Sequence, residues 1–597
     1  MFPILATAKV TTLDIIVTIT YMALIVGAGC WVGIRHRRKS AASGEAREYF
    51  LAGSTLTWPM IGMALFATNI SCVHLVSLAQ AGFEEGLLQG NFEWMAAFTL
   101  VLLAIFFAPF YIRSRIATLP DFLEKRYGRT CRDILAGFSL VSAILIHIGF
   151  SLLTGAIVLS GLFDINPWVS IVVIAVATAA YVVVGGLMAV VFTETVETVV
   201  LLVGAVLITY FSFKFLGGDA GVAGGWSKLM SLLESPQEKQ MMSMLRPAGD
   251  SSGMPWYAIF LGYPVLGIWY WCADQTIVQR VLGAKDENHA RVGPLFAALI
   301  KILPVFLFVL PGLMFYAIVK SGSFEDLRIL WAEGATRPGL ELATGGTWAA
   351  IETKEAYTHM IVRLLPSGLT GVMAAALIAA LMSTVSGALN SISTLFSYDL
   401  WKRFKPETPD HKLVTIGRVA AVCAMLVAIG LVPLLSRYGS IFRGINDIIA
   451  HIAPPVTAVF LWGVLWKGAS YRGALTTMIG GAITGMLVFA TNKLGGESAP
   501  AFIRDTNFMM MAFYLFLFCS ALLFVSSMLM PKRAGEDPEQ LYFKSLGECL
   551  AFKGWSGIGN YKFLAVLVIA VMALMTPSGG RPVAALSKRH AQSNPFE

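Results

Sequence analysis

Fourteen apolar stretches follow one another along this chain and occupy somewhat over half of its 597 residues. Most contain about 20 residues or more, which is the helix length that crosses the ~30 Å hydrocarbon core of a bilayer. Hydrophobic residues make up 56% of the chain and charged residues 13%, unlike any ordinary water-soluble protein. The sequence therefore predicts an all-α polytopic membrane protein with 14 transmembrane helices. The predicted spans are 13–34, 54–81, 92–112, 133–162, 167–184, 189–213, 255–279, 292–319, 367–398, 414–435, 440–465, 473–492, 509–530 and 563–576.

The polar connections between these stretches are short, the longest running about 40 to 47 residues. Such lengths cannot hold an ATP-hydrolysing domain or a receptor ectodomain. The composition and spacing therefore exclude ATP-driven pumps and sensor kinases.

The basic residues set the predicted orientation in the membrane. The cluster Arg35-His36-Arg37-Arg38-Lys39 and four other basic connections fall on one face when the spans alternate strictly. Lysine and arginine are enriched in cytoplasmic loops, so this face is predicted to be cytoplasmic and both termini to lie outside. The outward loops 214–254 and 320–366 carry no Asn-x-Ser/Thr sequon. We expect a plasma-membrane location, with a bacterial inner membrane favoured.

Two predicted spans contain polar or helix-breaking residues at mid-membrane. Thr68-Asn69-Ile70-Ser71, followed by His74, interrupts span 54–81, and Gly262-Tyr263-Pro264 with Gly267 interrupts span 255–279. Irregular backbone at this depth is tolerated only where it faces protein or a water-filled cavity. The two interruptions are five spans apart, and an odd number inverts the second unit relative to the first. This spacing predicts two inverted five-helix repeats around a central binding site.

The predicted repeats divide the chain into an extra N-terminal helix, two five-helix units, three C-terminal helices and a tail. The predicted boundaries are 13–34, 54–213, 255–465, 473–576 and 577–597.

Lys301 is a lone cation about nine residues inside its predicted span. A lysine near the bilayer centre costs about 2.5–3.5 kcal/mol on insertion scales, so it persists where it has a partner or a function. We expect it to face a polar interior, although pairing with a carboxylate purely for assembly stays open.

Five carboxylates accompany Lys301 inside the predicted spans: Glu93, Glu194, Glu197, Asp274 and Asp447. We expect Glu93 near the outer mouth of a cavity, where it would hold a hydroxyl-rich ligand. Glu194 and Glu197 share a helical face because they are three residues apart. Their simplest interpretation is a salt bridge in a cytoplasmic vestibule.

Histidine and hydroxyl side chains give weaker signals. His74 lies one helical turn after Ile70 and so shares a face with the interruption. The remaining intramembrane histidines, His147 and His451, are interpreted as ordinary core residues. Span 367–398 contains Ser383-Thr384, whose hydroxyls beside unwound carbonyls suit a monovalent cation, although such hydroxyls more often bond to their own helix. No metal-ligand or hydrolytic arrangement stands out.

Several motifs occur in order between about residues 50 and 470 and carry a family resemblance. They are Leu65-Phe66-Ala67-Thr68-Asn69-Ile70 with His74, Phe92-Glu93-Trp94, Thr193-Glu194-Thr195, Trp269-Tyr270-Trp271-Cys272-Ala273-Asp274-Gln275, Leu310-Pro311-Gly312 and Leu381-Met382-Ser383. In these motifs the chain resembles the sodium/glucose cotransporter branch of the solute:sodium symporter family. That resemblance implies a LeuT-like fold of two inverted five-helix repeats and a sodium-coupled symporter rather than an enzyme.

The resemblance also implies roles for particular residues. Sodium would be held by Ala67, Ile70, Ala380, Ser383 and Thr384. Sugar would contact Asn69, His74, Glu93, Tyr270, Trp271, Lys301 and Asn446. Phe92, Tyr270 and Phe442 would act as gates, and Glu194 matches a position linked to cation coupling, where the family commonly has aspartate.

Two departures from the family pattern put the solute in doubt. Gly267 stands where relatives carry a hydrogen-bonding side chain, and Asn446 stands where a glutamine usually reaches the sugar. Each unsatisfied buried polar group costs about 1–3 kcal/mol, so these changes alter which hydroxyls are recognised. The expected function is import of a glucose- or galactose-like monosaccharide with sodium. Inositol, a monocarboxylate or an amino acid remain alternatives, as do an intramembrane transferase acting through His74 and Glu93 and a sugar sensor.

Overall fold

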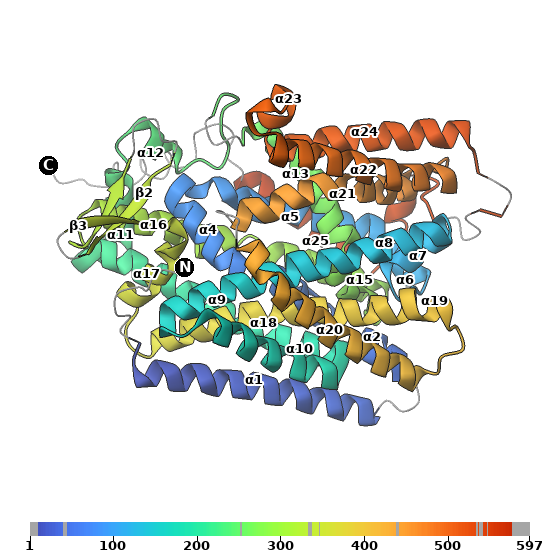
Figure 1. The fold of residues 1–597 in the computed structure, drawn as a ribbon, viewed down its shortest axis with the longest axis horizontal. Coiled ribbons are helices and arrows are strands. Elements are labelled where there is room, and N and C mark those ends of the chain that lie inside the picture. Colours follow the sequence, from blue (N-terminus) through green and yellow to red (C-terminus); the bar gives the residue numbers. More distant parts are fainter. Residues whose placement is uncertain are drawn as a thin grey trace.

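The protein is described here from a computed structural model covering residues 10–39, 45–250, 254–331, 337–344, 347–436, 441–532, 535–536, 541–545 and 547–575. Helices make up most of it (Figure 1). The helices of the first part are α1 (Thr12–Lys39), α2 (Glu45–Leu51), α3 (Trp58–Asn69), α4 (Cys72–Glu85), α5 (Gly90–Leu102), α6 (Ala108–Arg113), α7 (Leu119–Arg126), α8 (Arg129–Ser142), α9 (Phe150–Phe163), α10 (Pro167–Gly217), α11 (Gly221–Leu232) and α12 (Pro236–Gln240).

The second part continues the helical arrangement and adds one small sheet. Its helices are α13 (Trp256–Ile268), α14 (Gln275–Leu282), α15 (Glu287–Ile300), α16 (Leu310–Lys320), α17 (Ala356–Leu364), α18 (Leu369–Leu395), α19 (Lys402–Phe404), α20 (Asp410–Leu435), α21 (Ile441–Leu465), α22 (Tyr471–Gly495), α23 (Ala501–Arg504), α24 (Phe508–Leu529) and α25 (Tyr561–Met575). The strands β1 (Leu327–Leu330), β2 (Gly339–Thr344) and β3 (Thr347–Ile351) pair antiparallel in that order.

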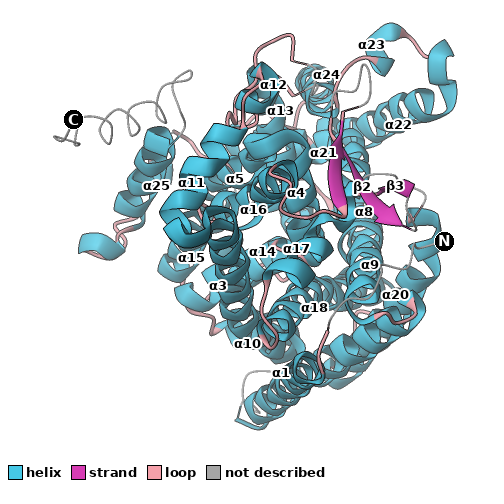
Figure 2. Ribbon diagram, turned by 90° about the vertical axis from the view of Figure 1, so that its left-hand side faces the viewer, coloured by secondary structure: helices cyan, strands magenta, loops and turns pink. Residues whose placement is uncertain are grey.

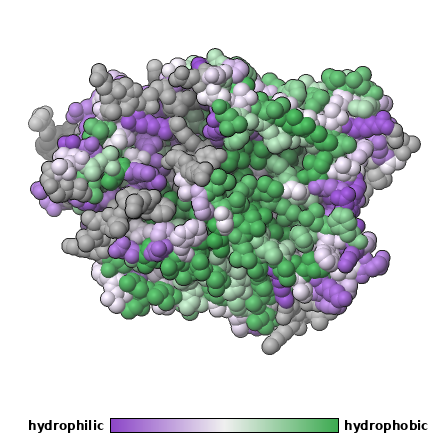
Figure 3. All heavy atoms as spheres, viewed as in Figure 1, coloured by the Kyte–Doolittle hydropathy of each residue, from purple (hydrophilic) through white to green (hydrophobic). Residues whose placement is uncertain are grey.

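The surface and the helix lengths define a multi-pass membrane protein. Among the described residues, ten helical segments are long and apolar enough to cross a bilayer, and α25 is a shorter apolar helix. A broad hydrophobic band crosses the middle of the molecule, and hydrophilic residues gather at its two ends (Figure 3). The small sheet, α11, α12 and α17 lie at one end, and α2, α7 and α19 lie at the other (Figure 1).

Helix α18 lies in the protein interior and packs against α10, α1 and α20. Every residue from Val385 to Leu395 is buried. In the second view, α1 lies on the opposite side of the bundle from α22 and α24 (Figure 2). The Asp14 carboxylate near the start of α1 accepts hydrogen bonds from the backbone N–H groups of Gly368 and Gly371, at 2.8 and 2.7 Å. Asp14 therefore ties α1 to the first turn of α18.

The first predicted interruption is present where the sequence placed it. Helix α3 ends at Asn69 and α4 begins at Cys72, with Ile70 (φ −79°, ψ 93°) and Ser71 (φ −92°, ψ 171°) in extended conformations. The Ser71 side chain accepts a hydrogen bond from the backbone of His74 and so caps α4. This cap satisfies donors that lipid could not satisfy.

The second interruption lies further along the chain than the sequence indicated. Helix α13 continues through Gly262 and Pro264 and becomes π-helical over Trp269–Ala273 before the chain breaks at Asp274 (φ −86°, ψ 122°). Gly262 serves packing instead, because a Cβ there would lie 2.4 Å from the carbonyl oxygen of Met509 on α24. The Asp274 carboxylate accepts the Thr276 N–H at 2.7 Å and starts α14.

Two of the predicted spans join in α10, which bends at Gly186. This glycine has φ 61° and ψ −155°, a conformation open essentially to glycine alone. A Cβ at Gly186 would lie 2.3 Å from the carbonyl oxygen of Tyr49 on α2. The bend therefore needs both the backbone freedom and the small size of glycine.

Candidate binding site

A cavity of about 120 Å³ lies beside the two interrupted helices. Its lining comes from α3, the α3–α4 link, α4, α5, α9, α13, the end of α15, α18, α21 and the π-helical segments Ala143–Gly149 and Trp269–Ala273. All seven residues that the sequence nominated for solute contact line it: Asn69, His74, Glu93, Tyr270, Trp271, Lys301 and Asn446. The structure therefore gathers in one cavity residues as far apart in the sequence as Asn69 and Asn446.

The charged centre of the cavity is an ion pair between Lys301 and Glu93. The Lys301 Nζ lies 2.5 Å from the Glu93 Oε2, and the two residues are 1% and 2% exposed. Lys301 caps the C-terminus of α15 and Glu93 lies in the first turn of α5, so each charge has the sign that its helix end favours. The ammonium also lies 5.4 Å from the Trp271 ring and 5.9 Å from the Phe66 ring. Charge pairing and aromatic faces together hold the buried lysine.

Asn69 presents an unsatisfied acceptor at the cavity. Its amide nitrogen donates to the Tyr270 hydroxyl at 3.2 Å, whereas its amide oxygen is buried without a hydrogen-bond partner. Buried polar atoms of this kind normally have a partner, so the oxygen suits a donor supplied by a ligand. The adjacent His74 Nδ1 accepts the Ser71 N–H at 3.3 Å, which orients the ring.

Several cavity residues were not nominated from the sequence, and two of them make notable contacts; the first is His147. It was interpreted as an ordinary core histidine, yet it lines the cavity, and its Nε2 lies 3.1 Å from Asp274 Oδ2. Its ring centroid is 5.9 Å from that of Tyr270. Asp274 therefore links His147, on the π-helical segment Ala143–Gly149, to the break before α14. The spacing of residues along a helix cannot reveal such a contact, because it depends on how the segment Ala143–Gly149 packs beside the break at Asp274.

The second is Tyr263, which lies within the Gly262-Tyr263-Pro264 interruption. It lines the cavity and packs edge-on against Phe92 at a centroid distance of 5.5 Å. A Cβ at Gly267 would lie 2.7 Å from both the Tyr263 ring and the Thr99 methyl. Tyr263 and Thr99 therefore fill the space that a side chain at Gly267 would need.

The predicted gate residues divide into three cases. Tyr270 is a wall of the cavity, and Phe92 lines it while stacking on Phe508 at 6.3 Å. The side chain of Phe442 lies outside the described residues.

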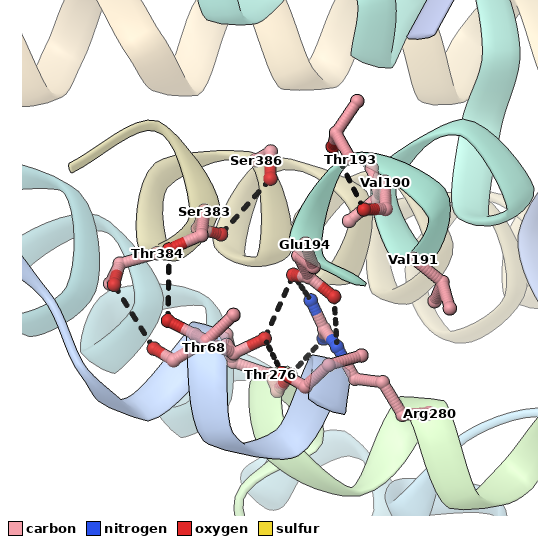
Figure 4. Close-up of polar contacts among 12 residues, drawn as sticks. Thr68, Val190, Val191, Thr193, Glu194, Thr276, Arg280, Ser383, Thr384 and Ser386 are labelled. Atoms are coloured by element: carbon pink, nitrogen blue, oxygen red, sulfur yellow. Dashed lines mark hydrogen bonds and ion pairs between the residues drawn. The ribbon is translucent and has the colours of Figure 1, made fainter. Parts of the chain in front are cut away.

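Oxygen atoms of α3 and α18 converge where the sequence nominated a sodium site (Figure 4). The Ser383 hydroxyl donates to the Ala67 carbonyl at 2.8 Å and also approaches the Ala380 carbonyl at 3.0 Å. The Thr384 hydroxyl donates to the carbonyl of Thr68 at 3.0 Å rather than to that of Ile70. Uncharged carbonyl and hydroxyl oxygens in this arrangement suit a monovalent cation.

Glu194 lies next to this oxygen cluster. Its carboxylate forms a fully buried ion pair with Arg280 and accepts the Thr68 hydroxyl at 2.8 Å (Figure 4). Arg280 also donates to the Thr276 carbonyl. The predicted salt bridge is thus present for Glu194, but it is enclosed in the protein instead of lying in a solvated vestibule. Glu197 is equally buried and takes no part in the pair.

Broken helices around a polar cavity at mid-membrane are the architecture typical of secondary transporters. A family model described as the sodium:solute symporter family matches residues 49–481. The chain belongs to this family and is a sodium-coupled transporter, not an enzyme.

Curated relatives are similar along most of their length. The sodium/mannose cotransporter SLC5A10 of Bos taurus is 31% identical over 92% of this chain and 92% of its own. Sodium/glucose cotransporter 2 of Rattus norvegicus is 32% identical over 85% of this chain and 77% of its own. The sodium/glucose cotransporter of Vibrio parahaemolyticus is 33% identical over 78% of this chain and 83% of its own.

A solved structure supports the fold independently. A Na⁺-coupled sialic acid symporter in a substrate-bound outward-open state superposes with a TM-score of 0.70. It is 20% identical, and the match covers 87% of this chain and 98% of the symporter. At this identity the likeness concerns the fold alone.

Proposed function

We propose that the protein imports a neutral monosaccharide, glucose- or galactose-like, together with sodium by alternating access. The observation that carries this proposal is the cavity itself, in which the Lys301–Glu93 pair, the free Asn69 acceptor and the Tyr270 ring meet. A sugar offers hydroxyls that both donate and accept, so it can bond an ammonium, a carboxylate and an amide at once. The ring of Tyr270 supplies an apolar face for the C–H side of a pyranose.

The ion pair favours a neutral solute over an anion. Lys301 is already paired with Glu93 at 2.5 Å, so the pair has no net charge to offer. A carboxylate ligand would have to displace Glu93 and leave that charge buried without a partner, which costs about 3–5 kcal/mol in comparable cases. Monocarboxylates and amino acids are therefore weaker candidates. Myo-inositol, also a neutral polyol, is the closest alternative, since a sodium/myo-inositol cotransporter 2 of Sus scrofa is 32% identical.

Sodium is proposed to bind at the oxygen cluster of α3 and α18. Its ligands would be the carbonyls of Ala67 and Ala380 and the hydroxyls of Ser383 and Thr384, with Ile70 in the unwound link as the fifth member. A cation here would hold α18 against the break of α3, beside the residues that face the solute. Glu194 would contribute to coupling through its bond to Thr68.

The energetics of this coupling are sufficient. One charge crossing the membrane gains about 2.3 kcal/mol per 100 mV, and each 1.4 kcal/mol is a tenfold change in an equilibrium ratio. One sodium ion per cycle therefore accumulates a neutral sugar more than tenfold before its own gradient is counted.

The proposed architecture has 14 spans, with repeats at 54–213 and 255–465, an N-terminal helix at 13–34, C-terminal helices at 473–576 and a tail at 577–597. The breaks at Ile70 and Asp274 support the pairing of the repeats, since each lies in the first helix of its unit. We place the protein in the plasma membrane of a bacterium with both termini outside. The basic end of α1 would then face the cytoplasm.

The test is uptake into proteoliposomes with an imposed sodium gradient. Labelled glucose, galactose, mannose, myo-inositol, a monocarboxylate and an amino acid are compared, each with choline replacing sodium as the control. We expect sodium-dependent accumulation of at least one hexose that an ionophore abolishes. Accumulation of the acid or the amino acid alone would overturn the solute assignment. Product formation without a gradient would indicate a transferase, and sugar-induced current without accumulation would indicate a sensor or channel.

A further inference from the structure

Glu197 is a buried carboxyl group that the proposed transport mechanism does not use. It lies on the second half of α10, is 1% exposed, and neither of its carboxyl oxygens has a hydrogen-bond partner. The guanidinium of Arg280, which pairs with Glu194 one turn away, is committed to Glu194 and to the Thr276 carbonyl. Among the residues that the structure describes, Glu197 therefore has no cation paired with it.

The surroundings of Glu197 contain hydroxyl groups and one other acid. Its electrostatic neighbours are Tyr21 on α1, Tyr181 on the first half of α10, and Glu194 one turn earlier. The Tyr21 hydroxyl is itself buried without a partner, and the Tyr181 hydroxyl donates to the Met382 carbonyl of α18 at 3.4 Å.

Close helix packing leaves this group with very little exposure to solvent. A Cβ at Gly29 of α1 would lie 2.9 Å from the Thr193 methyl and 3.1 Å from the Tyr181 Cβ. The helices α1, α10 and α18 pack directly against one another around it. An unpaired carboxylate in such a place loses its hydration and gains nothing in return, so the neutral acid is the form that this packing tolerates.

We propose that Glu197 is a proton-binding site whose occupancy opposes sodium binding at the neighbouring oxygen cluster. A chain of contacts joins the two places. Glu197 is one turn from Glu194, Glu194 bonds the Thr68 hydroxyl, and the Thr68 carbonyl accepts from Thr384. Sodium supplies the positive charge that lets Glu197 give its proton to solvent, and the proton returns when sodium leaves.

This proposal rests on the proposed sodium coupling and adds that proton binding opposes sodium binding. Linkage requires that a proton released by sodium binding weaken sodium binding when it returns. Apparent sodium affinity must therefore rise with pH, and sodium must release protons from the purified protein. For coupling free energies of the usual size, the affinity for sodium is at least about fivefold higher at high pH than at low pH.

The experiment uses the full-length protein in detergent. Sodium is added to weakly buffered samples, and proton release is read with a pH dye; the sodium concentration at half-saturation is measured at several values between pH 5.5 and 8.5. Wild-type protein is expected to release protons and to bind sodium at least about fivefold more tightly at the alkaline end. Glu197→Gln is expected to release none and to keep one weak, pH-independent affinity. Glu325→Gln, which changes an exposed carboxylate, is the matched control and should behave as wild type.

Three outcomes decide the question. Sodium binding without proton release in wild type overturns the inference, as does an unchanged pH response in Glu197→Gln. If that variant does not purify, the wild-type measurement decides, and Glu197→Asp should keep the release at a shifted pH. Absence of any sodium binding in wild type would instead refute the proposed function, so the two failures are distinguishable.

Discussion

The Lys301 ammonium lies 2.5 Å from the Glu93 carboxylate, although 208 positions separate the two residues in the sequence. Each side chain carries the sign of charge that its helix end favours, and both side chains line the cavity. A buried pair of this kind is a weak source of stability, but breaking it from one side is costly. It therefore serves better as a fixed pair of hydrogen-bonding groups for a ligand than as a structural clamp.

Single and double substitutions separate these two roles. Glu93→Gln and Lys301→Met each leave one uncompensated buried charge, so each should lower the free energy of unfolding by about 3–5 kcal/mol and abolish uptake. The double variant Glu93→Gln/Lys301→Met should regain most of the thermal stability while uptake stays absent. Thermal unfolding and labelled-sugar uptake measure the two effects. Recovery of uptake in the double variant would show that the pair only supports the fold.

Ser383→Ala tests the oxygen cluster. Removing the hydroxyl deletes one proposed ligand and one bond to the Ala67 carbonyl, worth about 1–1.5 kcal/mol, so the sodium concentration for half-maximal uptake should rise about tenfold. The control is Ser393→Ala on the same helix, whose hydroxyl is buried without a partner and should leave the sodium dependence unchanged. Normal sodium kinetics in Ser383→Ala would remove the assignment.

Gly186→Ala tests the bend in α10. The alanine would have to adopt φ 61° with its Cβ 2.3 Å from the Tyr49 carbonyl oxygen, so the free energy of unfolding should fall by about 1–3 kcal/mol from backbone strain, and further from the clash. Gly137→Ala in α8 is the control, because nothing lies within 4 Å of its Cβ, and it should match or slightly exceed wild-type stability. Thermal unfolding in detergent measures both. Equal melting temperatures would mean that the bend does not need glycine.

Glu355, at the end of the molecule that carries the small sheet, should make the stability of the protein depend on pH. It lies just before α17, outside the membrane-spanning segments, and is 7% exposed. Burial, reinforced by the charge of Glu352, raises the pKa of Glu355 from 4.5 to about 7. A raised pKa means that the folded protein binds the proton more tightly, so stability contributed here falls as pH rises from about 4.5 to 7 and then levels off.

Glu355→Gln should therefore match wild type at pH 5 and melt a few degrees higher at pH 8. Melting temperatures across this range provide the measurement. A constant difference between the two proteins at every pH would contradict the assignment.

Hydropathy and residue type predicted much of this fold. The break at Ile70 could be located because lipid cannot satisfy the polar groups of an interrupted helix, so such a stretch must face protein or water. Lys301 was placed in the protein interior because a charge facing lipid is costly. The second break was misplaced, since Gly262 serves close packing against α24 and the chain breaks only at Asp274. Glycine occurs both at breaks and at close contacts between helices, and the local sequence does not distinguish the two.

The residues nominated from the sequence for solute contact all line the cavity, but the nominated set was incomplete. His147 and Tyr263 were not nominated, because their part in the cavity depends on the rotation of their helices and on the neighbours that these helices meet. Glu194 and Glu197 look alike in sequence, three residues apart in one helix. The structure gives Arg280 to Glu194 and no partner to Glu197.

By itself, the sequence determined that this chain crosses a membrane many times, that one helix breaks beside Asn69, and that a lysine lies within the bilayer, because exclusion of water constrains each residue locally. The tertiary structure alone decided which charges meet, where the second helix breaks and which acid remains unpaired. Those outcomes depend on the packing of helices distant in sequence, and distances of a few ångströms between them set whether a buried charge is neutralised.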